Sequence, residues 1–276
     1  MKPIRKTGID LTANVNDITI CYDDLGPDND PIIFIHGFPF DKSSWEPQTD
    51  HLKSTRRVIA YDIRGFGKSG RGNQTLSMDL FANDLKHLLA YLQIDQVVAV
   101  GLSMGGYILM NALNKYPELF EGLVFCDTQC IADSKEGKEK RMKTIEQIKT
   151  NGLDEFAKGF INNIFSKDSI QNKTAMVDKI KNCILSTPQD TITDTLIALA
   201  ERPDMCSSLS KISVPTMILC GEEDVVTPLS QSEFMLKSIK HAVLKSIPNA
   251  GHMSNLEQPN LFNQFLEMHV PAMTKS

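Results

Sequence analysis

The sequence lacks the features that would associate this chain with a membrane or a nucleic acid. No apolar run approaches the roughly 18 residues that a membrane-spanning helix needs. The polar segment Met1–Leu11 has no apolar core of the kind found in a secretory signal peptide. With 29 basic and 34 acidic residues, the formal net charge is −5, so no basic excess attracts nucleic acid or an anionic membrane. We therefore expect neither kind of partner.

Cysteine pairs with the spacing of a metal site are also missing. The six cysteines lie at positions 21, 126, 130, 183, 206 and 220, and no two form a Cys-x-x-Cys pair. In a chain of 276 residues, such scattered cysteines predict neither a disulfide framework nor a zinc site. We expect them to be reduced, in a cytoplasmic protein that needs no metal and no cofactor.

The first part of the chain alternates short apolar runs with segments of helical periodicity. Apolar residues at helical spacing predict helices over Ser77–Leu92 and Met104–Lys115. Strands alternating with helices predict an α/β fold, with a mostly parallel central sheet flanked by helices. The apolar runs predict strands at Ile18–Tyr22, Pro31–His36, Arg57–Asp62, Gln96–Leu102 and Gly122–Cys126.

The pattern changes between residues 131 and 207, where no strand is predicted. This segment contains about four amphipathic helices, one with Thr187 as its N-cap and Pro188 in its first position. We therefore expect a core over residues 1–130, a helical insertion over 131–207 and the rest of the core over 208–276. The last part predicts strands at Val214–Cys220 and Ala242–Ile247 and helices at Leu229–Ile239 and Glu257–Met268.

The segment Gly101–Gly105 matches the G-x-S-x-G motif and lies between a predicted strand and a predicted helix. A sharp turn at this junction would project the Ser103 hydroxyl into a cleft. Such a turn is so crowded that the residues two before and two after the serine must be very small. We therefore predict Ser103 as a nucleophile; the alternative, a glycine-rich helix start with an incidental serine, does not explain the strand–turn–helix context.

A second loop, His36-Gly37-Phe38-Pro39, follows the strand that ends at His36. In acyl transfer a carbonyl oxygen gains negative charge, and fixed backbone amides stabilise it well. We predict that the amides of Phe38 and Met104 form this oxyanion hole. His36 itself is expected to be structural and not the catalytic base.

The loop Gly221–Pro228 follows a predicted strand, so a carboxylate there would point into the crevice at the sheet edge. Its spacing within the loop makes Asp224 the predicted acid. Glu222 and Glu223 are expected to be solvated. Asp127, at the end of another strand, stays open as a rival.

His252 lies in the loop Asn249–Met253, after the last predicted strand, and is the predicted base. Serine, acid and histidine then occur in the chain order that this kind of fold requires. His252 would take the Ser103 proton and return it to the leaving group. Asp224 would fix the histidine tautomer and stabilise the imidazolium.

These motifs together resemble the α/β-hydrolase superfamily over nearly the whole chain: HGFP at 36–39, DIRGFGKS at 62–69, GLSMGG at 101–106, and the pair GEEDVVTP and NAGHM. The resemblance implies that residues 131–207 form a helical cap over the active site. It also implies that the 62–69 loop is structural and helps to position the oxyanion loop. The chain looks similar to small bacterial carboxylesterases, to enol-lactone hydrolases such as 3-oxoadipate enol-lactonase, and to cofactor-free perhydrolases.

The resemblance limits the chemistry without naming the substrate. Epoxide hydrolases and haloalkane dehalogenases of this fold use an aspartate nucleophile, whereas this chain has a serine, and the lipase HGGG motif is absent. We expect hydrolysis of a small, partly apolar ester or lactone. C–C bond hydrolysis, amide cleavage and perhydrolysis by the same triad stay open, and a ligand receptor with a vestigial site is the remaining alternative. The oligomeric state is also open.

The sequence allows two roles for some apolar side chains, contact with substrate or ordinary packing. Trp45 either contacts substrate or packs on the sheet. Packing within the cap is the more ordinary role for any one of the residues that could line the pocket, which are Met142, Phe156, Phe160, Ile161 and Phe165.

Overall fold

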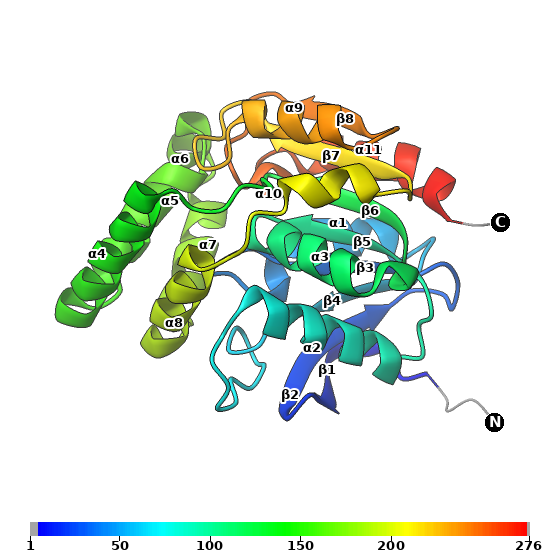
Figure 1. Cartoon of the computed structure of the whole chain (residues 1–276), viewed down its shortest axis with the longest axis horizontal. Helices are drawn as coiled ribbons and strands as arrows, with labels where there is room; N and C mark the ends of the chain where they lie inside the picture. The colour runs from blue at the N-terminus through cyan, green and yellow to red at the C-terminus, as the bar shows by residue number, and fades with distance from the viewer. Residues whose placement is uncertain (1–4, 275–276) are drawn as a thin grey trace.

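In the computed structural model, which describes residues 5–274, a single eight-stranded sheet forms the centre of the protein (Figure 1). The strand order is β1-β2-β4-β3-β5-β6-β7-β8. Strands β1 to β2 and β2 to β4 pair antiparallel, and all other neighbours pair parallel. The strands are β1 Gly8–Val15, β2 Ile18–Leu25, β3 Ile32–Ile35, β4 Val58–Tyr61, β5 Val97–Leu102, β6 Phe120–Cys126, β7 Thr216–Gly221 and β8 Val243–Ile247.

Helices cover the sheet, which explains the nearly continuous apolar strands. Every residue of β3, β4, β5 and β7 is buried, as expected for parallel strands covered on both faces. Helices α2 and α3 pack together and lie in front of the sheet in Figure 1, and α1 packs against α11. The flanking helices are α1 Glu46–Leu52, α2 Met78–Tyr91, α3 Met104–Lys115, α9 Leu229–Ser238, α10 Ser254–Glu257 and α11 Pro259–His269.

Trp45 packs inside the core. Its ring lies 4.9 Å from the ring of Phe34 on β3 and 6.0 Å from that of Phe262 on α11, and the residue is fully buried. Of the two roles considered for Trp45, packing against the sheet is therefore the correct one.

Five α-helices and no strand lie between β6 and β7, where the sequence predicts about four helices. In Figure 1 they gather to the left of the sheet. They are α4 Lys135–Asn151, α5 Asp154–Ile164, α6 Lys167–Asn172, α7 Thr174–Ser186 and α8 Gln189–Ala200, and we call residues 135–200 the helical segment. None of the helices in residues 5–274 combines the length and apolar character that crossing a bilayer requires.

Two local predictions are wrong at element boundaries, and one strand has no counterpart among the predicted elements. Strand β1 is missed because only one of its eight residues is buried and the strand, at the sheet edge, forms no apolar run. Thr187 is not the N-cap of α8, which is Pro188; the Thr187 hydroxyl instead donates to the Cys183 carbonyl at the end of α7. The last predicted helix is divided before Pro259, because proline disfavours a helical conformation in the residue that precedes it.

Cys130 and Cys206 form a disulfide, so the prediction that all six cysteines are reduced is wrong. Cys130 precedes α4 and Cys206 follows α8. The bond therefore joins the two stretches of chain that lead into and out of the helical segment. Beside it, the Met205 N–H donates to the Cys130 carbonyl at 2.8 Å. The two cysteines are 76 positions apart, and only the fold brings them together. Disulfides are typical of oxidising compartments, so cysteine usage no longer supports a cytoplasmic location.

Loss of this disulfide should lower stability, because a cross-link that closes a long loop restricts the unfolded chain. We expect Cys130→Ser to lower the free energy of unfolding by about 2–5 kcal/mol. Thermal unfolding with and without a thiol reductant measures the effect. Cys183→Ser, which removes a free cysteine, should stay as sensitive to reductant as the wild type. Equal melting temperatures for reduced and oxidised wild type would contradict the expectation.

Candidate active site

Ser103 lies at the junction between β5 and α3, where the motif predicts it. Its backbone has φ 52° and ψ −113°, a conformation that a residue with a side chain rarely adopts. The Ser103 N–H donates to the Cys126 carbonyl at the end of β6 at 2.9 Å. The turn is thus held against the neighbouring strand, and the strained residue is the one that carries the hydroxyl.

Close backbone contacts explain the two glycines of the motif. A Cβ on Gly105 would lie 2.2 Å from the Ile35 carbonyl oxygen at the end of β3. A Cβ on Gly101 would lie 2.6 Å from the carbonyl oxygen of Gly105 itself. Neither backbone atom can move without disturbing the turn, so both positions require glycine.

The loop after β3 lies directly against this turn. A Cβ on Gly37 would be 3.3 Å from the Ser103 Cβ, which places the next amide, that of Phe38, beside the serine. Within residues 5–274, no protein acceptor pairs with the amides of Phe38 and Met104. The Met104 amide is also at the N-terminus of α3, where the helix dipole favours negative charge.

His36 is a structural histidine, as predicted. The residue is fully buried, its Nε2 accepts a hydrogen bond from the Ile63 N–H at 2.9 Å, and its Nδ1 lies 2.8 Å from the Gly37 carbonyl oxygen. This pattern requires a proton on Nδ1 and a free lone pair on Nε2. Burial lowers the pKa of His36 to about 4, so the ring stays neutral. The ring therefore links the loop after β3 to the loop after β4.

The 62–69 loop is built on two buried acidic residues. The Asp62 carboxylate accepts the backbone N–H groups of Lys42 at 2.8 Å and Lys68 at 2.9 Å. Arg64 forms a buried two-pronged ion pair with Asp84 on α2, at 2.6 and 2.7 Å. These contacts tie the 62–69 loop to α2 and to the backbone of Lys42, which is consistent with the structural role that the resemblance implies.

Asp224 and His252 are joined by a buried hydrogen bond. Asp224 Oδ2 lies 2.8 Å from His252 Nδ1 and accepts the Thr227 hydroxyl at 2.7 Å. Asp224 Oδ1 accepts the N–H groups of Val226 at 2.8 Å and Thr227 at 3.0 Å. Four donors thus hold this carboxylate against the imidazole.

The pair has complementary pKa shifts. Burial favours the neutral form of each partner, but the mutual attraction and the hydrogen bonds outweigh it. The pKa of Asp224 therefore lies below its usual value, and the pKa of His252 lies above its usual value. The Asp224 carboxylate is therefore charged, and it stabilises the protonated form of His252.

The loop that carries His252 is bonded to the helical segment. The His252 and Met253 N–H groups donate to the Ile164 carbonyl at 2.8 and 3.2 Å. The buried Glu257 carboxylate accepts the N–H groups of Gly251 at 2.8 Å and Ser166 at 2.9 Å. The sequence places Glu257 only at the start of a helix, and no local signal marks this bridging role.

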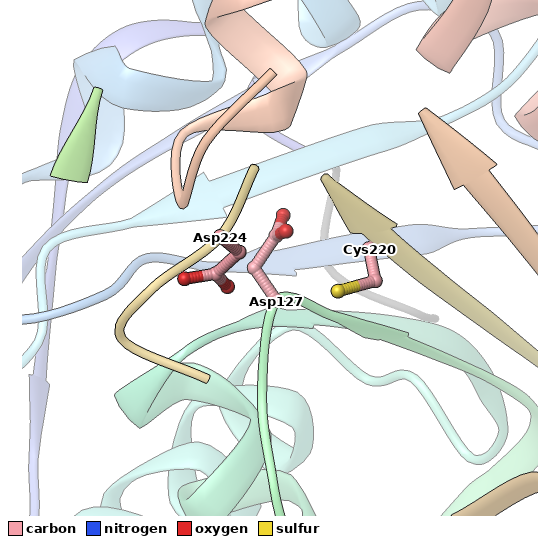
Figure 2. Close-up of side chains that lie close together, drawn as sticks. All are labelled: Asp127, Cys220 and Asp224. Atoms are coloured by element: carbon pink, nitrogen blue, oxygen red, sulfur yellow. The ribbon is translucent and has the colours of Figure 1, made fainter. Parts of the chain in front are cut away.

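The rival acid, Asp127, does not contact His252 through a hydrogen bond. Its Oδ1 accepts the Gly221 N–H at 2.8 Å, and its Oδ2 lies 2.5 Å from the Ser254 hydroxyl. Figure 2 shows Asp127 between Cys220 and Asp224. The geometry therefore favours Asp224 as the partner of His252, while Asp127 bonds to Gly221 and Ser254.

Asp127, Cys220 and Asp224 bring three possible metal-ligand atoms within 4.8 Å of one another, but they do not fit a metal ion. Each carboxylate oxygen of the two acids is already paired with a donor or hydroxyl group of the protein. Burial raises the pKa of the Cys220 thiol, which keeps it protonated. The cluster is therefore part of the framework around His252.

Ser103 is not hydrogen-bonded to His252 among the described residues. Its hydroxyl is on a rotatable bond, and hydrogen bonds of this kind are often formed only when substrate is present. Ser103, Asp224 and His252 all lie in turns at the same end of the sheet, and all are buried. The structure therefore brings the three predicted residues to one place and joins two of them directly.

A cavity of about 630 Å³ lies between α4, α5, α8 and the loop of Val225 and Val226. Phe156 and Phe160 line it, and the Phe160 ring packs on Phe38 with 6.0 Å between the ring centroids. Of the other predicted pocket residues, Ile161 and Phe165 are buried elsewhere and Met142 is exposed.

Similarities to individual known proteins extend over nearly the whole chain, and a family profile matches part of it. The sequence profile of the alpha/beta hydrolase fold family matches residues 30–143. The 3-oxoadipate enol-lactonase 2 of Acinetobacter baylyi is 27% identical over 257 residues, covering 93% of this chain and 94% of that protein. A thermophilic esterase from Thermogutta terrifontis is 31% identical and has a TM-score of 0.91 over 96% of this chain and 99% of its own. A bromoperoxidase from Bacillus anthracis is 25% identical, with a TM-score of 0.83 over 92% of this chain and 96% of its own.

Gly105→Ala should destabilise the protein, since its Cβ would overlap the Ile35 carbonyl oxygen. We expect the free energy of unfolding to fall by at least about 2 kcal/mol. Gly159→Ala is the matched control, because Gly159 is exposed within α5 and has nothing within 4 Å of an added Cβ. This change should raise stability by about 0.5–1 kcal/mol. Denaturant unfolding of both variants tests the pair, and a Gly105→Ala variant as stable as the wild type would refute the close approach.

Proposed function

Because the chain belongs to the α/β-hydrolase family, we propose that it is a serine hydrolase that cleaves a small carboxylic ester or lactone through an acyl-enzyme on Ser103. The fold class predicted from the sequence is confirmed. The similarity to an enol-lactonase and an esterase supports ester or lactone hydrolysis in general. The observation that carries the serine mechanism is the buried Asp224–His252 pair at the end of the sheet where strained Ser103 lies.

In the proposed acylation, His252 Nε2 takes the proton of Ser103 Oγ as this oxygen attacks the substrate carbonyl carbon. Asp224 keeps the other proton of the ring on Nδ1 and stabilises the imidazolium that forms. The imidazolium then gives its proton to the leaving alkoxide, and the acyl group stays on Ser103. Water, deprotonated by His252, attacks the acyl carbon in the second half and releases the acid and free serine.

The oxyanion of both tetrahedral intermediates would be bound by the amides of Phe38 and Met104. Neither amide has a protein acceptor within residues 5–274, both lie beside Ser103, and one of them is at a helix N-terminus. Such donors need no reorganisation when the charge develops, which makes them effective in a buried site.

We assign residues 131–207 as the cap of this site, between core parts 1–130 and 208–276. The contact of the Ile164 carbonyl with the His252 loop supports this assignment. The cavity of about 630 Å³, with Phe156 and Phe160 in its wall but neither Ser103 nor His252, would hold the part of a small and partly apolar substrate that lies away from the reacting carbonyl.

A second candidate is perhydrolysis, favoured by the similarity to a bromoperoxidase. In this reaction hydrogen peroxide replaces water in the second half and attacks the acyl-enzyme. A peracid and free Ser103 are the products, and the residues keep the same roles. Formation of peracid from an ester and peroxide would distinguish it from hydrolysis.

Hydrolysis of p-nitrophenyl esters from acetate to octanoate tests the proposed function. We expect the wild type to turn over the shorter esters and Ser103→Ala to be slower by roughly 10³–10⁶-fold, because the nucleophile is lost. The folded state of Ser103→Ala is checked by thermal unfolding. A wild type inactive on every ester, or a variant with near-wild-type turnover, would contradict the proposal.

The pH dependence should reflect the raised pKa of His252. Protonated His252 cannot accept the Ser103 proton, so kcat/KM should fall as the pH drops through this pKa, which lies above the usual value for a histidine. Asp224→Asn removes the largest of the charges that raise it, so the acidic limb should move to lower pH and kcat should fall by about 10⁴-fold. Rate profiles between about pH 5 and 9 measure both effects. An acidic limb that stays in place in Asp224→Asn would exclude Asp224 as the partner of His252.

A further inference from the structure

Asp127 is a fully buried acid that the proposed mechanism does not use. It directly follows β6, and its φ of 44° is a strained value for a residue with a side chain. Both of its neighbours bond to Ser103. The Cys126 carbonyl accepts the Ser103 N–H at 2.9 Å, and the Thr128 hydroxyl donates to the Ser103 carbonyl at 2.8 Å. The backbone around Asp127 therefore holds the predicted nucleophile.

The Asp127 side chain reaches the segments that carry the other two predicted residues. Its Oδ1 accepts the N–H of Gly221, the last residue of β7, three positions before Asp224. Its Oδ2 lies 2.5 Å from the Ser254 hydroxyl, two positions after His252. One carboxyl group thus connects the loop that carries Asp224 and the loop that carries His252 to β6.

The charge state of Asp127 follows from its neighbours. Carboxylate oxygens of Asp127 and Asp224 lie within 4.8 Å of each other. Two buried carboxylates so close together are unfavourable when both are ionised. Asp224 has four donors, His252 among them, that stabilise its negative charge. Burial and the charge of Asp224 raise the pKa of Asp127 well above its usual value. The proton therefore stays on Asp127.

We infer that Asp127 is a positioning residue, a neutral carboxyl group that ties the Asp224 loop and the His252 loop together by its bonds to Gly221 and Ser254. This inference rests on the proposed serine mechanism. A neutral carboxyl group keeps one oxygen as an acceptor for the Gly221 amide. Its other oxygen carries the proton, and this O–H can donate to the Ser254 hydroxyl, which can accept a hydrogen bond as well as donate one.

Asparagine has the same shape as a protonated aspartic acid and offers the same acceptor and donor. Asp127→Asn therefore separates the neutral role from a charged one, and Asp127→Ala removes both bonds. The other titratable groups that face Asp127 are Asp224, His252 and the thiols of Cys126 and Cys220. Burial raises the pKa of both thiols, so the acidic limb of the rate profile reports on the acids and the imidazole.

The experiment compares kcat, KM and the pH profile of p-nitrophenyl ester hydrolysis in four variants. Asp127→Ala should lower kcat by about 10²-fold with little change in KM, because the base and its partner are misplaced. Asp127→Asn should restore kcat to within about fivefold of the wild type, with the acidic limb unmoved, because no charge is lost. Ser254→Ala should lower kcat less than Asp127→Ala does. Glu223→Ala, an exposed acid one residue before Asp224, is the control and should match the wild type.

Two results would overturn the inference. One is an Asp127→Ala variant with wild-type kcat. The other is an Asp127→Asn variant as slow as Asp127→Ala whose acidic limb has moved to lower pH, which would show that Asp127 acts as an anion. If Asp127→Ala does not fold, the Asp127→Asn and Ser254→Ala profiles decide.

Failure of the proposed function gives a different pattern. In that case the wild type itself hydrolyses no ester, whatever occupies position 127. The rate at which a fluorophosphonate labels Ser103 then replaces turnover as the readout of how well His252 is placed. Slow labelling of Asp127→Ala and restored labelling of Asp127→Asn would still support the positioning role, and equal labelling of all variants would overturn it.

Discussion

The candidate site depends on one constraint, which is that β5, β6, β7 and β8 are parallel and end at the same edge of the sheet. Leu102 pairs with Cys126, and Cys126 pairs with Leu219, so the strands end in step. The residues that follow each strand are then neighbours in space although they are far apart in the chain. Hydrogen-bonded register, set by backbone geometry, thus determines where the reactive groups meet.

Because these strands end together, ionisable side chains lie close to one another in a buried place. Each one must be stabilised by hydrogen bonds or an opposite charge, or else stay neutral. The Asp224 charge is stabilised by four donors, while the neighbouring Asp127 is neutralised by its proton. Burial lowers the pKa of His36, whose ring nitrogens bond to backbone groups, whereas the Asp224 carboxylate outweighs burial and raises the pKa of His252. Two buried histidines therefore differ because of what faces their rings.

The helical segment is attached to this edge at several points. The disulfide between Cys130 and Cys206 joins its two flanks, and the Ile164 carbonyl binds the backbone of the His252 loop. Glu257 adds a carboxylate bridge from the core to Ser166. The proposed cap and the proposed base are thus parts of one hydrogen-bonded unit, so movement of one is expected to affect the other.

Local sequence determined the buried strands, most helices and the motif at Ser103, because apolar periodicity and glycine crowding act over a few residues. The order of motifs also determined the family resemblance, and with it Asp224 and His252 as candidates. Only the tertiary structure shows that Asp224, and not Asp127, is hydrogen-bonded to the His252 imidazole, since both acids follow buried strands. It also decided the edge strand β1, the pairing of Cys130 with Cys206 and the bridging role of Glu257. Each of these depends on contacts between distant segments, which no local pattern specifies.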